Sequence, residues 1–475
     1  MNREKLQQLD AVDPLSHLRE AFDIPEGKIC LNGNSLGPVC KASKQRIEEV
    51  VNEQWRSDLI SSWNKHNWID LPLVTGNKIA PLIGAREGQV ICCDSVSVNL
   101  FKLLSCALML KPEYETLITL RDNFPTDLYI AEGLSQFLGE SRLRVRSLDL
   151  DELEQALDST PAIVMLTQVN FRDGSVLDIE SITRRAQSAG SLVIWDLSHS
   201  VGVMPLAMDD WNVDFAVGCG YKYLNGGPGA PAFLYAAERY HRHCRHALQG
   251  WMGHKAPFEF REEYDASEGI MRFLSGTPPI LSLAALDSAL QLFNGVSSHE
   301  LREKSATLAE CFLDLKKQRA ELNALTLVSP AHPGQRGAQL CFRRKNTGRG
   351  VLVVDDCASS HGGTTCCVAV AAAHAVVAAG RGGGQRGVAG PRRRRAAALD
   401  GVEVDETAAA FSAGRPPRPT KSATTSCAPS LAAEGDVSSE TPTCRSKRWQ
   451  KRRPSLKPSS TAARVRSWAT TGPSR

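Results

Sequence analysis

The chain has 475 residues and a mass of 51.6 kDa, a length that suits two or three domains. Hydrophobic residues make up 42% and charged residues 23%, and no run reaches the roughly 18 apolar residues that a membrane-spanning helix needs. The first residues carry charges with no apolar stretch behind them, which argues against a secretory signal. Fourteen cysteines without a CxxC pair argue against a zinc ribbon or a thioredoxin-type site, so reduced thiols in a cytoplasmic protein are expected.

The composition of the chain changes near residue 344. Residues 346–475 carry 20 Lys and Arg against 9 Asp and Glu, whereas residues 1–345 carry 36 against 43. The later segment holds four Leu and one Phe, too little apolar surface to offset the entropy of ordering its backbone. It is either a disordered tail or the product of a reading-frame shift, and the random spacing of its Ala, Arg, Gly and Pro favours the shift.

Residues 1–345 have the pattern of a mixed α/β protein. Apolar, β-branched runs favour strands buried on both faces, as in a parallel sheet, and segments of helical spacing lie between them. Residues 179–190 are apolar or small on one face and end in Gly190, which predicts an amphipathic helix. A long surface helix is predicted over 300–322. The strand-length runs are TLITL (116–120), AIVMLT (162–167), SLVIWD (191–196), DFAVGC (214–219) and APAFLY (230–235).

These elements predict four segments of the chain. An N-terminal segment covers 1–30 and a large ligand-binding domain covers 31–290. A smaller α+β domain begins over 291–343 and is incomplete, because the tail 344–475 does not continue it.

The most specific group of candidate residues is Asp196, His199 and Lys222. Asp196 ends an apolar run, and ligands of open α/β sheets bind outside the carboxyl ends of strands. Lys222 directly follows the run 214–219 and precedes a glycine-rich turn. A single lysine in such a place is more often a surface residue. Together with an upstream carboxylate it favours pyridoxal phosphate (PLP) chemistry, in which an acid holds the pyridine nitrogen protonated and a lysine forms the imine.

A phosphate needs hydrogen-bond donors, which residues 94–104 offer. Asp94, Ser95 and Ser97 lie at the start of an apolar helical stretch, whose first amides and the Ser97 hydroxyl would hold a phosphate. An ordinary helix cap is the simpler interpretation. In NFPTD (123–127) an aromatic ring would lie on a cofactor ring, whereas a Pro-containing turn is the plain alternative.

Other patterns are weaker. HRHCRH (241–246) lacks the spacing of a two-histidine metal site on a helix and favours a basic surface helix. Cys92 and Cys93 end a strand-like run and are predicted to be core residues. The basic runs at 391–395 and 447–453 would bind nucleic acid by charge alone.

Seven motifs that occur in order carry a resemblance to a known family. Together they resemble the bacterial kynureninases, PLP-dependent hydrolases of fold type I in the class V aminotransferase superfamily, over residues 5–343. The resemblance implies an α/β fold, with a mostly parallel seven-stranded sheet covered by helices, and a cytoplasmic homodimer with its sites at the interface. The motifs are LNGNSLG (31–37), SVSVNLFK (95–102), NFPTDLYIAEGL (123–134), DLSHSVG (196–202), YKYLNGGPG (221–229), GWMGH (250–254) and GTPPI (276–280).

The resemblance also implies roles for individual residues, and no metal. Lys222 resembles the Schiff-base lysine, Asp196 the partner of the pyridine nitrogen, and Tyr221 a phosphate ligand that also transfers protons. Trp63 falls where the family contacts the aromatic ring of the substrate. The other implied cofactor contacts are Val96 and Ser97 beside the phosphate, the ring-stacking loop Phe124, Pro125, Thr126 and Asp127, then Thr167 and His199, and finally Trp251 and Thr277 from the partner subunit.

The implied reaction is the hydrolytic cleavage of L-kynurenine, 3-hydroxykynurenine or both, to L-alanine and anthranilate or 3-hydroxyanthranilate, in tryptophan catabolism and NAD biosynthesis. After residue 343 the family supplies an arginine for the substrate α-carboxylate, and residues 344–475 contain no comparable stretch. A bidentate arginine–carboxylate contact orients as well as binds, so its loss predicts weak activity or none for this chain.

Two other functions stay open on the sequence. Another PLP enzyme, such as a cysteine desulfurase, needs a nucleophilic cysteine on a flexible later loop, and none here has a convincing setting. An inactive protein whose basic tail binds nucleic acid would show a salt-dependent affinity that disappears on deletion of residues 346–475.

Overall fold

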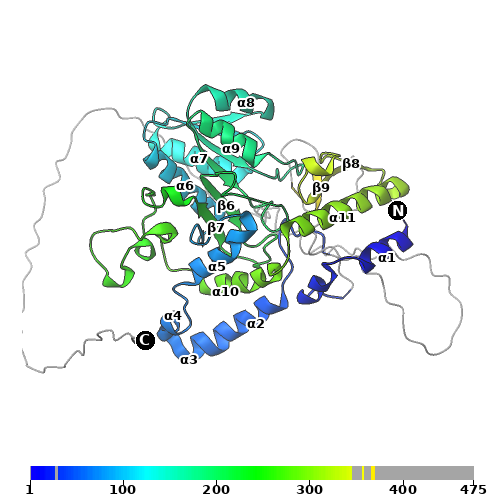
Figure 1. Ribbon diagram of the computed structural model, residues 1–475, viewed down its shortest axis with the longest axis horizontal. Helices are drawn as coiled ribbons and strands as arrows, with labels where there is room; N and C mark the ends of the chain where they lie inside the picture. The colour runs from blue at the N-terminus through cyan, green and yellow to red at the C-terminus, as the bar shows by residue number, and fades with distance from the viewer. Residues whose placement is uncertain (1, 27–29, 345–355, 358–364, 370–475) are drawn as a thin grey trace, which may run out of the picture. The chain divides into compact units, whose positions relative to one another are not determined.

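The computed structural model describes residues 2–26, 30–344, 356–357 and 365–369 (Figure 1). Its main sheet has seven strands in the order β1-β7-β6-β5-β4-β2-β3. Strands β2 to β6 are parallel, and β7 runs antiparallel to both of its neighbours. The predicted α/β fold with a mostly parallel sheet is confirmed. The strands are β1 (Val90–Cys92), β2 (Thr116–Leu120), β3 (Arg144–Leu148), β4 (Ile163–Thr167), β5 (Leu192–Asp196), β6 (Phe215–Cys219) and β7 (Ala232–Ala236).

The five apolar runs of the sequence are β2 and β4 to β7, and the sequence analysis did not predict β3. Strand β3 lies at the edge of the sheet and pairs only with β2 among the described strands. Its residues alternate, with Arg144 and Arg146 exposed, so it lacks the continuous apolar run of a central strand. Cys92 ends β1 and Cys93 follows it, and both are buried core residues as predicted.

Helices cover both faces of the main sheet, because successive side chains of a buried strand point to opposite faces. On one face, Ile163 and Met165 pack with α6 (Val96–Leu110) and α7 (Pro125–Leu138). On the other face, Val164 lies in the same cluster as residues of five α-helices. These are α5 (Leu71–Ile79), α8 (Leu150–Ser159), α9 (Ile179–Ser188), α10 (Ile280–Ala289) and the start of α11 (Ser298–Gln318). Helix α9 is the amphipathic helix predicted before Gly190, which has a positive φ of 88°.

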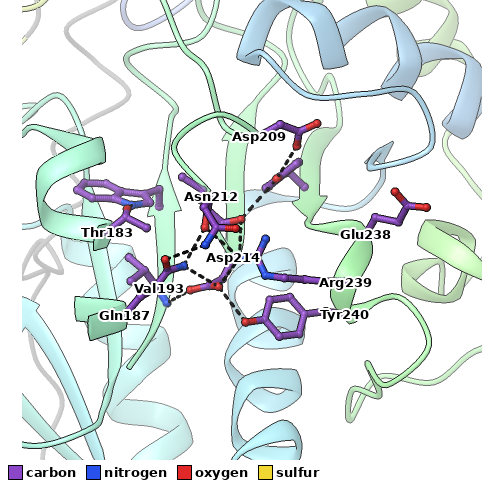
Figure 2. Close-up of polar contacts among 12 residues, drawn as sticks. Thr183, Gln187, Val193, Asp209, Asn212, Asp214, Glu238, Arg239 and Tyr240 are labelled. Atoms are coloured by element: carbon purple, nitrogen blue, oxygen red, sulfur yellow. Dashed lines mark hydrogen bonds and ion pairs between the residues drawn. The ribbon is translucent and has the colours of Figure 1, made fainter. Parts of the chain in front are cut away.

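The buried carboxylate of Asp214, just before β6, ties together the end of the sheet at which the parallel strands begin (Figure 2). It accepts hydrogen bonds from the Val193 amide at 2.8 Å, from the Gln187 amide group at 3.0 Å and from the Tyr240 hydroxyl at 2.9 Å. Arg239 completes the set with an ion pair at 2.6 Å. This cluster fixes the amino ends of β5 and β6 to neighbouring segments, while the carboxyl ends stay available for a ligand.

A second, four-stranded antiparallel sheet has the order β10-β11-β9-β8. It packs against α11 (Ser298–Gln318), where Ala309 meets Leu340 and Phe342. Helix α11 is the long helix predicted over 300–322, and its last residues form a separate short turn of helix. The sequence analysis did not predict β10 and β11, which lie after the change of composition. The strands are β8 (Leu325–Leu327), β9 (Gln339–Arg344), β10 (Asp356–Cys357) and β11 (Thr365–Ala369).

The division of the chain into four segments stays a prediction. Most of the tail, including the basic runs at 391–395 and 447–453, lies outside the described residues.

Shorter helical segments connect the elements described above. The connecting segments are α1 (Arg3–Ala11), η1 (Ser16–Ala21), α2 (Lys41–Glu49), η2 (Val50–Trp55), α3 (Arg56–Asp58), η3 (Leu59–Ser61), α4 (Ser62–Lys65), η4 (Ala80–Ile83), η5 (Glu238–Tyr240), η6 (Trp251–Gly253), η7 (Pro257–Glu259), η8 (Gly269–Phe273), η9 (Leu290–Phe293), η10 (Ala320–Leu322) and η11 (Pro333–Gln335).

Residues 241–246 do not form the predicted basic surface helix. Two of their histidines are buried, and each ring binds a backbone carbonyl: His241 Nε2 lies 2.8 Å from Ala236 O, and His246 Nε2 lies 2.9 Å from Arg272 O. The prediction was wrong because these tertiary bonds hold the segment in turns. Among the described residues, no group of three or more His, Cys, Asp and Glu side chains is placed to hold a metal ion.

In the part of the chain that the structure describes, no single helix has the length and apolar character to cross a membrane. One helix pair, Ile280–Phe293 with Ser298–Gln318, meets the length and composition criteria together and is bent by 83°.

Candidate active site

Thr167 and Asp196 lie side by side at the carboxyl ends of β4 and β5, where they are register partners. Because strand side chains alternate, both point to the face of the sheet that α6 and α7 cover, like Met165 and Ile194. The edge at which the parallel strands end is the usual ligand site of an open α/β sheet. The sequence motifs therefore converge on this edge.

Asp196 is a buried carboxylate, 3% exposed. Its Oδ1 accepts hydrogen bonds from the Ser198 amide at 2.8 Å and from the Ser198 hydroxyl at 2.6 Å. Burial raises the pKa of Asp196, and the Ser198 bonds and the charge of Lys222 oppose that rise. A carboxylate in this setting gains from a cationic partner such as a protonated ring nitrogen.

Lys222 follows β6 and is held by His199. The lysine Nζ lies 2.7 Å from His199 Nε2, and His199 Nδ1 lies 2.8 Å from Gln339 Oε1. All three side chains are buried. Burial and then the charge of Lys222 lower the pKa of His199 to about 3, so the imidazole is neutral. The three candidate residues Asp196, His199 and Lys222 thus meet at the ends of β5 and β6, as the sequence predicted.

Aromatic rings flank the lysine. Lys222 Nζ lies 5.7 Å from the centre of the Phe124 ring and 5.9 Å from that of Tyr221. The Phe124 ring also meets the edge of Phe171 at 5.1 Å. Burial, followed by the charges of Cys219 and Asp196, raises the pKa of Tyr221 to about 12, which keeps its hydroxyl protonated.

Asp127 lies in the first turn of α7 and is fully buried. Thr167 donates to its Oδ2 at 3.4 Å, whereas Oδ1 accepts no hydrogen bond within the described residues. Burial raises the pKa of Asp127 well above its usual range, and the charge of Asp196 adds to the rise. A buried carboxylate oxygen without a partner is costly, so it marks a place where a ligand group belongs.

The start of α6 offers the phosphate donors that the sequence predicted. The Ser95 side chain caps the helix by accepting from the Val98 amide at 3.3 Å, and Asp94 before it has a positive φ of 49°. Val96 and Ser97 form the first turn, whose amides have no partner within the helix. The first-turn amides lie at the positive end of the helix, where anions bind, and the phosphate role of this turn stays a prediction beside the helix cap that Ser95 forms.

Four predicted residues have other surroundings. Pro125 and Thr126 are the first two residues of α7, and their contact with the cofactor stays a prediction. Trp251 is 38% exposed and stacks with Phe260 at 6.2 Å, and Thr277 is exposed. No hydrogen bond or ring contact among the described residues joins Trp251 or Thr277 to Asp196, His199 or Lys222.

Trp63 is half-buried and packs edge-on against Trp68 at 5.8 Å. Within the described part of the chain, no hydrogen bond or ring contact joins Trp63 to Phe124 or Lys222, and its role at the substrate ring stays a prediction.

Sequence reasoning missed two site residues. Gln339 binds His199 from β9, far along the chain, and its only signal was a polar residue inside the strand-like run RGAQLCFRR. Asn123 binds the Thr167 hydroxyl and accepts from the Phe124 amide at 2.7 Å. The motif NFPTD contained Asn123, but its role depends on the neighbouring strand.

The residues of this edge fit PLP. Asp196 suits the ring nitrogen, Lys222 the aldehyde carbon, the start of α6 the phosphate, and the partnerless Oδ1 of Asp127 a polar group of the ligand. The α/β fold and this set of residues define a PLP-binding class of protein. Residues 76–368 match the aminotransferase class-V family model, and the chain belongs to that family.

Three similar proteins narrow the family. The chain is 42% identical over 358 residues to the kynureninase of Deinococcus radiodurans. This match covers 74% of this chain and 87% of the relative. The chain is 43% identical over 345 residues to the kynureninase of Burkholderia pseudomallei (72% and 83%), and 43% over 339 residues to that of Pseudomonas fluorescens (70% and 81%). Within class V the chain is a member of the kynureninase family.

Solved structures agree on the fold at much lower identity. A cysteine desulfurase from Thermococcus onnurineus NA1 superimposes with a TM-score of 0.57 at 17% identity, over 70% of this chain and 82% of the other. A lysine mutant of C-DES, with glycine covalently linked to its PLP cofactor, gives 0.60 at 17%, over 69% and 86%. Desulfurases are thus more distant relatives than the kynureninases.

Proposed function

We propose that this chain is a kynureninase, a PLP-dependent hydrolase that cleaves a carbon–carbon bond of L-kynurenine, 3-hydroxykynurenine or both. The products are L-alanine and anthranilate or 3-hydroxyanthranilate, in tryptophan catabolism and NAD biosynthesis. The observation that carries the proposal is the lysine held at the carboxyl ends of the strands, with Nζ 2.7 Å from a neutral histidine and a buried carboxylate beside it.

When bound, PLP supplies the electron sink of the reaction. Asp196 holds the proton of the ring nitrogen, because its burial favours a close cationic partner over ionisation alone. The first turn of α6 and the Ser97 hydroxyl would bind the phosphate, and Phe124 would lie against the ring. Val96 contributes through its backbone amide.

The remaining residues of the site move protons and hold the substrate. Lys222 Nζ is the amine that binds the cofactor and then carries a proton at the substrate α-carbon. The Tyr221 hydroxyl stays protonated at neutral pH and can donate at the reacting side of the site. Asp127 and Thr167 form a hydrogen-bonded pair that fixes the ring position.

We further propose a cytoplasmic homodimer. The exposed position of Trp251 and Thr277 supports it, because residues that serve a site in the partner must lie on the surface of their own subunit. Trp63, at the edge of the core, takes the aromatic ring of the substrate.

The sequence of the tail affects the turnover that we expect of this chain. The family's arginine for the substrate α-carboxylate has no counterpart in the sequence of residues 344–475, so we expect cofactor binding to survive better than turnover.

Absorbance and fluorescence test the proposal in one sample. Purified chain is mixed with PLP and then with kynurenine, beside Lys222→Ala. A visible imine band that is absent in Lys222→Ala, followed by anthranilate fluorescence, is the expected result for a working kynureninase. A band without anthranilate places the fault in the region after residue 343. Persulfide from cysteine instead of anthranilate would overturn the proposal.

A further inference from the structure

We propose that Gln339 is a positioning residue, which holds His199 as the tautomer with the proton on Nδ1 and leaves a bare Nε2 towards Lys222. The proposal extends the proposed function and rests on it only for the role of Lys222 as the reacting lysine. The arrangement of the three side chains stands on the hydrogen bonds alone.

The orientation of the Gln339 amide is fixed by two backbone carbonyls. Gln339 is 1% exposed, and its Nε2 donates to Asn170 O at 3.1 Å and to Phe171 O at 3.3 Å. Carbonyl oxygens only accept hydrogen bonds, so the NH₂ group must face them. The other end of the amide, Oε1, therefore faces His199.

This orientation decides which nitrogen of His199 carries the proton. Gln339 Oε1 lies 2.8 Å from Nδ1 and can only accept, so Nδ1 is the donor. A neutral ring then has its lone pair on Nε2, 2.7 Å from Lys222 Nζ. The low pKa of His199, about 3, agrees, because a second ring proton would point at the lysine.

The consequence is a fixed acceptor for the lysine. A ring free to exchange tautomers would present an N–H to Lys222 part of the time and displace the amine. Gln339 begins β9, so the lysine is tied to the four-stranded sheet as well as to the main sheet that carries it. The register partner of Gln339 in that sheet is Ala369, in β11.

Nitrogen NMR of histidine-labelled full-length chain without PLP tests the tautomer directly. Lys222 itself favours a bare Nε2, so the test uses Lys222→Met as the background. We expect His199, assigned by loss of its signal in His199→Asn, to keep the Nδ1–H pattern in Lys222→Met. Adding Gln339→Leu should shift the ring to the Nε2–H tautomer or to a mixture.

Two further variants separate positioning from general damage to the fold. Adding Gln339→Glu instead should retain a proton on Nδ1, because one carboxylate oxygen still accepts there, although the bonds to Asn170 O and Phe171 O are lost. Gln89→Leu is the matched control, since Gln89 is also a buried glutamine bonded at both ends of its amide, to Asp209 and to the Glu238 amide. It should leave the His199 signals unchanged. Loss of Nδ1–H in Lys222→Met alone, or its persistence after Gln339→Leu, overturns the proposal.

Turnover gives a second readout in chain with Lys222 intact. For histidines that ligate metals, loss of the partner that orients the ring typically costs about 10–100-fold, and we take that range as a guide. We expect a fall of that order in kcat for Gln339→Leu, little change in KM, a smaller fall for Gln339→Glu, and no change for Gln89→Leu. An unchanged kcat in Gln339→Leu contradicts the role at Lys222. A parent chain that forms the imine band but shows no turnover has its fault in the region after residue 343, and the NMR result then decides the tautomer alone.

Discussion

Gly37 and Lys222 lie against each other although 185 positions separate them. A Cβ on Gly37 would lie 2.4 Å from the Lys222 carbonyl oxygen and 2.4 Å from Asn225 Oδ1. The Gly37 amide also donates to the Tyr221 carbonyl at 2.9 Å. The motif LNGNSLG, near the start of the chain, therefore packs against residues 221–225. Gly37 allows this close packing because it has no side chain.

Gly37→Ala is expected to impair the site more than the fold. The added methyl group cannot fit beside the backbone of Lys222, so the loop must move and carry Nζ out of line. We expect kcat/KM to fall by roughly 100-fold, the cost of a displacement of about 1 Å. Kinetics and the imine absorbance measure the effect.

The matched control for that change is Gly133→Ala. Gly133 lies inside α7, and a Cβ there would meet nothing within 4 Å. Alanine in a helix should raise the free energy of unfolding by up to about 1 kcal/mol and leave turnover unchanged. Equal kinetic losses in the two variants would disprove the contact between Gly37 and the lysine loop.

Asp196→Asn tests the charge beside the lysine. Asparagine keeps the shape of the side chain and an oxygen for the Ser198 donors, but it cannot hold a ring proton by charge. Turnover should fall roughly 100–1000-fold, as for loss of other placed electrostatic groups. Steady-state kinetics at saturating PLP measure it. Ser198→Ala, which removes one of the two donors to Asp196, should cost much less; a larger loss there would mean that the hydrogen bonds matter more than the charge.

Asp127 makes the stability of the cofactor-free chain depend on pH. Its folded-state pKa lies above the ordinary value of 3.8, because of burial and then the charge of Asp196. The protonated form thus stabilises the fold fully below about pH 3.8, and that contribution is lost as the pH rises towards the folded-state pKa. Within this window the free energy of unfolding should fall by up to about 1.4 kcal/mol per pH unit from this group.

Asp127→Asn removes the titration and keeps the shape. In urea unfolding without PLP, the variant should match the parent near pH 4 and become the more stable chain as the pH rises to neutral. A constant difference between the two chains across that range would show that Asp127 is not titrating in the fold.

Asp214→Ala should lower the free energy of unfolding and leave catalysis unchanged. The change leaves Arg239 without its carboxylate and the buried Val193 amide without an acceptor (Figure 2). We expect the free energy of unfolding to fall by about 3 kcal/mol. Residual activity per folded molecule should be unchanged, because the cluster lies at the amino ends of the strands.

Asp158→Ala is the exposed counterpart of that change. Asp158 also pairs with an arginine, Arg185 at 2.6 Å, but both side chains are open to solvent. Its removal should cost at most about 1 kcal/mol. If the two substitutions lower the free energy of unfolding equally in chemical denaturation, burial is not the reason that the Asp214 ion pair stabilises the fold.

The sequence by itself determined most strands of the main sheet and the candidate residues Asp196 and Lys222. Continuous apolar runs predicted β2 and β4 to β7, because strands buried on both faces need apolar side chains at every position. Because Asp196 ends the apolar run 191–196, the sequence placed that carboxylate at the ligand edge of the sheet. The glycine-rich motif around Lys222, taken together with the upstream carboxylate of Asp196, marked the lysine as a candidate.

The tertiary structure decided what depends on contacts between distant segments. Gln339 reaches His199 across 140 positions, and no local pattern marks a glutamine in a strand as a histidine partner. Gly37 serves the lysine loop from before the first strand, and His241 and His246 are buried because backbone carbonyls bind them. Propensity and periodicity describe neighbours along the chain, whereas these contacts arise only when the packed sheet brings separate segments together.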